Sequence, residues 1–370
     1  MALKNAIDPA LAAERLATTI ERRIEGARDV RVTGVEVPKS TGMSNETVLF
    51  DAAWTQDGEP RSERLAARVQ PSGPAVFPRY DLALEFSVMS ALDAHTDVPV
   101  PGMLFVEEDR AALGAPFIVM RRVDGRVPAD DPPFTAQGWV LELSPDEQAR
   151  LSENAVQALA KIHAVDLDAV GLGALREHPE AGIDGQLRLW RETFAWAAAG
   201  DANPTVEAAF DWVAENRPAD EAPTVLNWGD ARIGNIIFAD DMAVGAVLDW
   251  EMTAVGPPGL DVGWWLFMSR YYTEGIGAPA PPGFPSREAF LARYEELTGT
   301  AVADLDFYEA LAGLRLSVLM HRAGNLMVAA GLLPPDAPMK LCNPASQLLA
   351  KLLGLPAPEG VAQSFVGNRS

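Results

Sequence analysis

The fold of this 370-residue chain is decided by Asn227-Trp228-Gly229-Asp230-Ala231-Arg232-Ile233-Gly234-Asn235-Ile236-Ile237-Phe238, with Val247-Leu248-Asp249-Trp250-Glu251 shortly after it. Apolar runs at Asn235 to Phe238 and Val244 to Leu248 flank a polar turn, which predicts a β-hairpin. Such a hairpin brings Asn235 and Asp249 side by side at its open end. Gly229 and Gly234 let the preceding loop bend tightly, so we expect Asp230 at the same opening.

Three oxygen-bearing side chains in this order fit one kind of chemistry. Transfer of a phosphoryl group from ATP needs one carboxylate to orient the acceptor hydroxyl. It also needs an amide oxygen and a second carboxylate to hold Mg²⁺. An Asp-x-x-x-x-Asn spacing occurs by chance in many chains, and Asp at a strand end is more often a turn residue. The combination of Asp230, Asn235 and Asp249 therefore predicts phosphoryl transfer, where each residue alone would not.

Composition limits the partners of this chain. Fifty-two acidic residues against 30 basic ones give a formal net charge of −22, which argues against nucleic acid or an anionic membrane surface as a partner and permits a cationic substrate. A single cysteine, Cys342, excludes an intramolecular disulfide framework and indicates a reducing compartment. Met1 to Thr19 lacks the pattern of a signal peptide, and no apolar run is long enough to span a membrane. We expect a cytoplasmic protein, and the sequence leaves its oligomeric state open.

The first third of the chain predicts a small α+β lobe. A helix beginning at Asp8-Pro9 is followed by three strands, a second helix and two more strands. The expected ranges after the first helix are Val30 to Val37, Thr47 to Trp54, Leu65 to Val69, Arg79 to Leu92, Met103 to Val106 and Phe117 to Met120.

The remainder predicts a larger, mainly helical lobe, with the boundary near Arg121, so that the domains are 1–121 and 122–370. Ser144-Pro145-Asp146-Glu147 is a capping box that begins a helix. Other helical stretches surround Trp190, Trp212, Trp264 and Phe290, and a long helix runs from Leu305 past His321. The Gly- and Pro-rich segment 275–285 predicts a loop, which we expect to border the site of the acceptor.

Two features of the first lobe fit phosphate binding. The loop from Ser40 to Thr47 lies between two strands, where backbone N–H groups can face anionic oxygens, although it has one glycine and a plain hairpin loop is the alternative. Arg68 ends the third strand. Glu85 lies on the apolar face of the following helix, where an unpaired carboxylate is costly, so we expect an ion pair with Arg68. The alternative is a glutamate at the helix edge that reaches solvent.

With these elements in order, the chain resembles the aminoglycoside phosphotransferase family of small-molecule kinases, from about Val30 to the helix containing His321. The most specific stretches are Trp228 to Asn235 and Leu248-Asp249-Trp250-Glu251, with support from Pro116 to Met120 and Leu159 to Asp166. The Asp-Trp-Glu form is similar to kinase domains linked to acyl-CoA metabolism as much as to antibiotic-resistance enzymes. The resemblance implies a two-lobed α+β fold like that of protein kinases, with ATP and Mg²⁺ as cofactors.

The resemblance also implies roles for individual residues. Asp230 is expected to be the catalytic aspartate, with Arg232 near the transferred phosphate and Asn235 and Asp249 as metal ligands. Asp261 is expected to brace the catalytic loop. The expected nucleotide-binding residues are Thr41, Gly42, Ser44, Asn45, Arg68, Glu85, Met120, Arg121 and Val123, of which residues 120–123 form the hinge strand. Two alternatives stay open. Arg232 can instead be a surface residue, and Glu251 can be either a second metal ligand or a surface residue.

One departure from the family pattern defines a second hypothesis. The family usually has histidine where Trp228 stands. A regulatory module that binds nucleotide without phosphotransfer is therefore the alternative to an enzyme. The acceptor itself stays open among aminoglycosides, other amino sugars, choline-like cations and hydroxyacyl compounds, as does the choice of ATP or GTP.

P-loop, dinucleotide-binding, zinc and serine-hydrolase signatures are missing from the sequence. His163 is interpreted as a core or helix-end residue.

Overall fold

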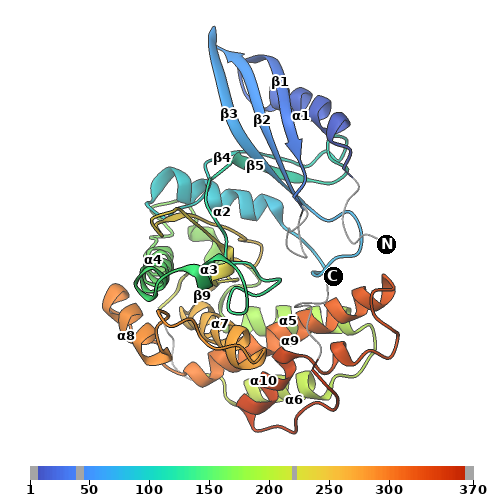
Figure 1. The fold of residues 1–370 in the computed structure, drawn as a ribbon, viewed down its shortest axis with the longest axis vertical. Coiled ribbons are helices and arrows are strands. Elements are labelled where there is room, and N and C mark those ends of the chain that lie inside the picture. Colours follow the sequence, from blue (N-terminus) through green and yellow to red (C-terminus); the bar gives the residue numbers. More distant parts are fainter. Residues whose placement is uncertain (1–6, 39–45, 219–222, 363–370) are drawn as a thin grey trace. The chain divides into compact units, whose positions relative to one another are not determined.

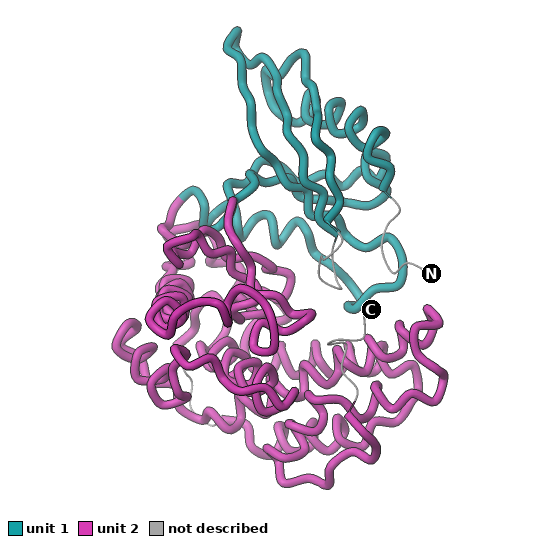
Figure 2. Tube along the Cα trace, in the orientation of Figure 1, with its two compact units in different colours: residues 1–94, 100–123 teal, residues 95–99, 124–370 magenta. Residues whose placement is uncertain are grey.

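The structure is a computed structural model that describes residues 7–38, 46–218 and 223–362. The chain divides into two compact units, one of residues 1–94 and 100–123 and the other of residues 95–99 and 124–370 (Figure 2). Within the second unit, the Pro99 carbonyl accepts a backbone hydrogen bond from Val247 at 2.7 Å.

Unit 1 is built on a five-stranded antiparallel sheet in the order β1-β2-β3-β5-β4 (Figure 1). Its strands are β1 (Ala27–Glu36), β2 (Glu46–Gln56), β3 (Glu59–Val69), β4 (Met103–Glu107) and β5 (Phe117–Arg121). Asp57 and Gly58 have positive φ angles of 53° and 81° in the β2–β3 turn, the conformation that suits a two-residue hairpin. The sheet predicted from the sequence is confirmed.

Two helices accompany this sheet. α1 (Pro9–Arg23) begins at the predicted cap, where the Asp8 carboxylate accepts the N–H of Ala10 at 2.9 Å. Ala12, Leu16 and Ile20 of α1 are buried in one core with the strands. α2 (Leu82–His95) begins three residues later than expected, because the side chain of Asp81 accepts the N–H of Leu84 and so caps the helix there.

Unit 2 is mainly helical. Its helices are α3 (Trp139–Glu142), α4 (Pro145–His163), α5 (Gly182–Ala198), α6 (Pro204–Glu215), α7 (Gly259–Arg270), α8 (Arg287–Thr298), α9 (Leu305–Ala329) and α10 (Pro344–Leu353). Single turns are η1 (Gly173–Glu177), η2 (Ile233–Asn235), η3 (Tyr271–Gly275) and η4 (Pro338–Lys340), of which η3 is a π-helical turn that extends α7. The capping box at Ser144 is present in full.

Two short antiparallel ladders lie among these helices. β6 (Val225–Asn227) pairs with β9 (Ala254–Gly256), and β7 (Ile236–Phe238) pairs with β8 (Val244–Val247). The predicted hairpin is therefore present, but the placement of Asn235 in its first strand was wrong. Asn235 ends the 3₁₀ turn η2, whose closure is a bond from the Asn235 N–H to the Arg232 carbonyl at 3.0 Å.

Within the described residues, none of the helices combines the length and apolar character needed to cross a bilayer.

Candidate functional site

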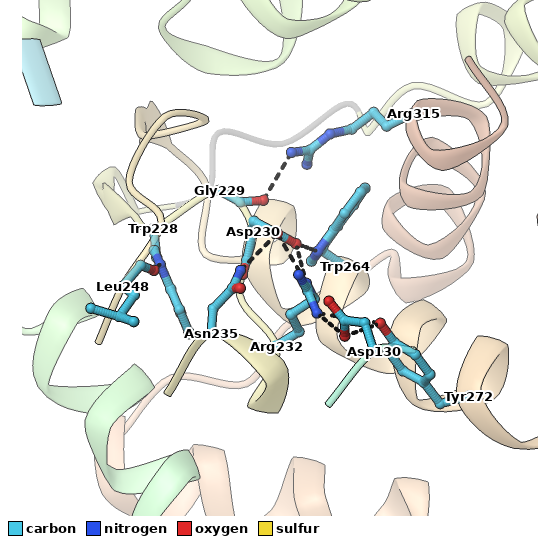
Figure 3. Close-up of polar contacts among 10 residues, drawn as sticks. All are labelled: Asp130, Trp228, Gly229, Asp230, Arg232, Asn235, Leu248, Trp264, Tyr272 and Arg315. Atoms are coloured by element: carbon cyan, nitrogen blue, oxygen red, sulfur yellow. Dashed lines mark hydrogen bonds and ion pairs between the residues drawn. The ribbon is translucent and has the colours of Figure 1, made fainter. Parts of the chain in front are cut away.

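The site lies in unit 2, on the loop between β6 and β7, and centres on the carboxylate of Asp230 (Figure 3). Three side chains donate to this carboxylate. Trp264 Nε1 reaches Oδ1 at 2.7 Å, Asn235 Nδ2 reaches Oδ2 at 2.7 Å, and Arg232 Nε lies 3.1 Å from Oδ1 and 3.0 Å from Oδ2. The side chain of Asp230 is 13% exposed, so these donors hold a mostly buried charge in one orientation.

Arg232 connects Asp230 to a second acidic residue. Its Nη1 donates to Asp130 Oδ1 at 2.5 Å and to the hydroxyl of Tyr272 at 3.3 Å, while the Tyr272 hydroxyl donates to Asp130 Oδ1 at 2.6 Å. Burial would lower the pKa of Arg232, but the carboxylates of Asp130 and Asp230 outweigh it and raise that pKa above its usual range. Burial and the nearby charge of Asp130 raise the pKa of Tyr272. Arg232 is thus a fixed cation and not a surface arginine.

The backbone of the loop that carries Asp230 is held by Asp261, the fully buried third residue of α7. Its Oδ2 accepts the N–H of Trp228 at 2.7 Å and its Oδ1 accepts the N–H of Gly229 at 2.8 Å. His163, at the end of α4, links Asp261 at 3.0 Å to the Tyr294 hydroxyl at 2.6 Å. The bracing role expected for Asp261 and the core position expected for His163 are both present.

Arg315 of α9 approaches the same loop from another direction. Its Nη2 donates to the carbonyl of Gly229 at 2.9 Å, and its guanidinium lies 4.5 Å from the ring centroid of Trp264 (Figure 3). Burial lowers the pKa of Arg315 to about 10. A buried cation therefore fixes both the loop and the ring that donates to Asp230.

Two glycines are required here for different reasons. Gly229 has φ +95°, and a Cβ on it would lie 2.0 Å from the carbonyl oxygen of Met252. A Cβ on Gly234 would lie 2.4 Å from Arg232 Nη1 and 2.8 Å from Asp130 Oδ1. Gly229 lets the backbone turn, and Gly234 leaves room for the Arg232–Asp130 pair.

The hairpin pairs Asn235 with Leu248, the residue before Asp249. The Leu248 N–H donates to the Asn235 carbonyl at 2.8 Å. Asp249 is therefore the first residue after the last hydrogen bond of the hairpin. Asp249 has φ +65°, a left-handed conformation that is unusual for a residue other than glycine and that recurs at functional sites.

The donor set at this end of the hairpin suits Mg²⁺. The Asn235 amide donates through Nδ2 to the Asp230 carbonyl at 3.1 Å and to Asp230 Oδ2 at 2.7 Å, so its Oδ1 is the atom that can meet a metal. Asp249 adds a carboxylate, and such hard oxygens are what Mg²⁺ prefers, with phosphate and water completing its shell. Among residues 7–38, 46–218 and 223–362, no cluster of three or more His, Cys, Asp and Glu side chains is arranged to hold a metal alone.

In unit 1, the ion pair predicted between β3 and α2 is present. Arg68 Nε lies 3.1 Å from Glu85 Oε1, and the Glu85 side chain is 3% exposed. Met120 is buried in β5 and Arg121 pairs with Glu63 at 3.2 Å, while Val123 is the last residue of the unit. Thr41, Gly42, Ser44 and Asn45 lie outside the described residues.

Some residues of the site were not predicted from the sequence. Asp130 lies in a Pro-rich stretch without periodicity, and Tyr272 follows a helix, so neither carries a local signal. Trp264 and Arg315 lie on helices whose apolar patterns point only to a core. These residues join the site through contacts 34 to 142 positions apart in the chain.

The sequence relatives of this chain are longer proteins, and the match covers only a part of each. It is 29% identical over 278 residues to acyl-CoA dehydrogenase family member 10 of Mus musculus, covering 75% of this chain and 23% of that protein. It is 29% identical over 292 residues to acyl-CoA dehydrogenase family member 11 of Gallus gallus, covering 75% of this chain and 35% of that protein. The chain thus spans about a third or less of the length of these relatives.

Solved structures share the fold. A protein from Ralstonia eutropha JMP134, provisionally named an aminoglycoside phosphotransferase, superposes with a TM-score of 0.65 at 24% identity, covering 92% of this chain and 98% of that one. Macrolide 2′-phosphotransferase type I superposes with a TM-score of 0.54 at 16% identity, covering 96% and 100%. These neighbours bear out the α+β, protein-kinase-like fold class expected from the sequence. The model of the phosphotransferase enzyme family, APH, matches residues 40–314, and the chain belongs to that family.

Proposed function

We propose that the protein transfers the γ-phosphoryl group of ATP to a hydroxyl of a small molecule. The observation that carries this proposal is the Asp230 carboxylate, oriented by Trp264, Arg232 and Asn235 at bond lengths of 2.7 to 3.1 Å. A carboxylate held in this way can position an acceptor hydroxyl and take up its proton as the oxygen attacks phosphorus. The family match supports phosphotransfer as the reaction class.

Arg232 would stabilise the charge that develops on the transferred group. Its guanidinium is 14% exposed and is fixed on two sides by Asp230 and Asp130. A preorganised cation needs no rearrangement at the moment of reaction, which is why such groups lower barriers efficiently.

Asn235 Oδ1 and the Asp249 carboxylate would hold Mg²⁺, which when bound neutralises phosphate charge. The hydrogen bond from Asn235 Nδ2 to Asp230 Oδ2 at 2.7 Å would hold the metal ligand and the catalytic carboxylate at a fixed distance from each other. The left-handed backbone of Asp249 would aim its side chain toward the same opening.

Nucleotide binding would be the role of unit 1. Arg68, held by Glu85, would contact the phosphates, and residues 120–123 would lie against the adenine. Thr41, Gly42, Ser44 and Asn45 remain candidates for contacts with the phosphates. Structural neighbours have been solved with GDP and with ADP, so the preference for ATP over GTP is part of the proposal. We also propose a cytoplasmic location, from the single cysteine.

The test is the variant Asp230→Asn, with Asp211→Asn on the exposed face of α6 as a matched control. We expect Asp230→Asn to lower ATP turnover with an accepted alcohol by about 10²–10⁴-fold, the range typical of a lost general base. Asp211→Asn should retain the activity of the parent protein. Thermal shift with Mg-ATP should still detect nucleotide binding by Asp230→Asn.

Undiminished turnover by Asp230→Asn would refute the assignment of the catalytic residue. Mg-ATP binding without turnover on any acceptor in a broad metabolite panel would favour the regulatory-module hypothesis. The argument for that module from Trp228 is weakened because Trp228 Nε1 donates to the Leu248 carbonyl at 2.8 Å and so supports the segment that carries Asp249.

A further inference from the structure

A cavity of about 220 Å³ lies in unit 2 directly beside the catalytic loop. Arg232 and Tyr272 belong to the lining, and Figure 3 shows Arg232 beside Asp230 and Tyr272 farther to the right. The other lining residues come from α4, α7, α8, η2 and η3 and from the segments 134–135 and 280–286. Arg232 lines the cavity and donates to the Asp230 carboxylate at 3.0 Å, so the cavity and Asp230 are separated by one side chain.

Five aromatic side chains form part of the cavity walls. Trp265 and Phe290 stack with centroids 5.5 Å apart and an angle of 13°, and Phe134 and Phe284 stack at 5.9 Å and 28°. Met268 and Ile233 also line the space. Such walls favour an apolar group, since a polar one would lose its water without replacement.

Three hydroxyl groups of the lining are already engaged by backbone carbonyls of the chain itself. Thr135 Oγ1 donates to the Tyr272 carbonyl at 2.5 Å, Ser269 Oγ to the Trp265 carbonyl at 2.8 Å, and Thr273 Oγ1 to the Ser269 carbonyl at 2.8 Å. These side chains therefore offer few donors to a sugar-like ligand.

The charges of the lining disfavour a cation. Its ionisable side chains include Arg232, Arg270 and Arg287, and the lining residues, all from the described part of the chain, include no Asp or Glu. Arg270 Nη2 is paired with Glu274 at 3.0 Å, and Arg287 Nε with Glu309 at 3.0 Å. The ammonium groups of a polycationic sugar would lie near arginines and would find no carboxylate in the lining. An anion would have to compete for these arginines with the carboxylates that already pair with them.

We infer that the acceptor is an alcohol carrying an uncharged apolar group, either a short aliphatic chain or one aromatic ring, which fills this cavity while its hydroxyl faces Asp230. A cavity of about 150 Å³ is enough to take a benzene-sized molecule, so the volume suits such a group. This inference rests on the proposed phosphotransfer and names the class of its acceptor. It excludes polycationic aminoglycosides as the preferred acceptor.

The first experiment measures binding. Saturation-transfer NMR would give dissociation constants for 1-alkanols from ethanol to 1-octanol, for benzyl alcohol and for kanamycin as a polycation. We expect the dissociation constant to fall roughly fourfold per methylene until the cavity is full. Kanamycin should not displace 1-hexanol.

Variants at Phe284 tie the binding to this cavity. Phe284→Asp adds a charge to the wall and should raise the dissociation constant of 1-hexanol by tenfold or more, whereas Phe284→Leu should change it less than about threefold. Leu332→Asp, at an exposed position outside the cavity, controls for an added carboxylate and should bind as the parent does. Thermal unfolding of each variant checks that it is folded.

The second experiment measures phosphorylation of the same compounds by ³¹P NMR. Binding that does not depend on chain length, or that Phe284→Asp leaves unchanged, overturns the inference. Asp230-dependent phosphorylation of kanamycin in preference to the alcohols also overturns it but leaves the proposed phosphotransfer intact. Chain-length-dependent binding without Asp230-dependent turnover on any compound supports the apolar site and counts against the phosphotransfer.

Discussion

Trp228 shows how one residue can replace another of different chemistry. Its indole is fully buried beside Trp250, with centroids 6.3 Å apart, and its Nε1 donates to the carbonyl of Leu248, the residue before Asp249. The aromatic ring fills space, and the N–H connects the loop that carries Asp230 to the proposed metal-binding segment. Both functions could be served by an imidazole, the side chain usual in the family.

The substitution Trp228→Phe isolates the hydrogen bond. It keeps most of the ring and leaves the Leu248 carbonyl without this donor, so we expect a loss of about 1–3 kcal/mol in the free energy of unfolding. Urea denaturation measures this loss. Trp212→Phe, at a half-buried position on α6, is the control and should cost less. Equal losses for the two variants would show that the indole N–H contributes nothing specific.

Gly229→Ala tests whether the close approach at the catalytic loop matters beyond its positive φ. The methyl group would meet the Met252 carbonyl, so the loss of stability should exceed that of Gly171→Ala, where φ is +76° and nothing lies within 4 Å of the added atom. A left-handed alanine costs about 1–2 kcal/mol by itself. Denaturant unfolding of both variants gives the difference, and similar values would contradict the clash.

At the scale of elements, α1 is attached to the end of β4 by charge as well as by apolar packing. Arg22 Nη2 lies 2.5 Å from Glu107 Oε2, and Arg23 donates to both carboxylate oxygens at 2.9 Å. The Glu107 side chain is 1% exposed, and the bond from Arg23 is the main cause that lowers its pKa to about 2. The backbone N–H of Asp109 contributes to the same shift.

This attachment predicts a dependence of stability on pH. The pKa of Glu107 is about 2 in the folded state and near 4.5 in the unfolded state, so between these values the unfolded chain binds more protons. The stabilisation is complete above about pH 4.5 and is lost as the pH falls toward 2, by up to about 3 kcal/mol. Urea unfolding at pH 3 to 6 should show a weaker pH dependence in Glu107→Gln than in Glu14→Gln, an exposed control on α1. Parallel pH profiles would contradict the assignment.

Most elements could be predicted because their signals are local. The signals at Asp8-Pro9, Ser144-Pro145 and the Asp57-Gly58 turn each depend on three or four neighbouring residues. The apolar residues of α1 and α4 recur with the period of a helix. The error at Asn235 has a local cause too. A 3₁₀ turn of three residues has no period to detect, and the apolar residues beside it resemble a strand.

On the scale of the whole molecule, the two units carry different parts of the proposed chemistry. Arg68 and Glu85 belong to unit 1, whereas Asp230, Asn235 and Asp249 belong to unit 2. We therefore expect variants in the two units to affect different steps.

For each variant, the measurement is the difference between its melting temperatures with and without Mg-ATP. Arg68→Gln should reduce this rise, with apparent affinity falling by about 10- to 100-fold, because a bond to a charged phosphate is worth about 1.5–3 kcal/mol. Its melting temperature without nucleotide should also fall, since Glu85 would lose the charge of Arg68. Arg31→Gln, exposed on β1, is the control, and Asp230→Asn should keep the full rise. A full rise in Arg68→Gln would contradict the role given to unit 1.

The sequence by itself determined the fold class, the hairpin between Asn235 and Asp249, the Asp230–Asn235 contact and the Arg68–Glu85 pair. It could do so because each of these depends on short spacings or on the cost of burying an unpaired charge. Only the tertiary structure decided that Trp264, Asp130, Tyr272 and Arg315 complete the surroundings of Asp230, and that aromatic residues from α7 and α8 enclose an apolar cavity beside it. Those contacts join residues far apart in the chain, and no local pattern encodes which side chains will meet once helices have packed.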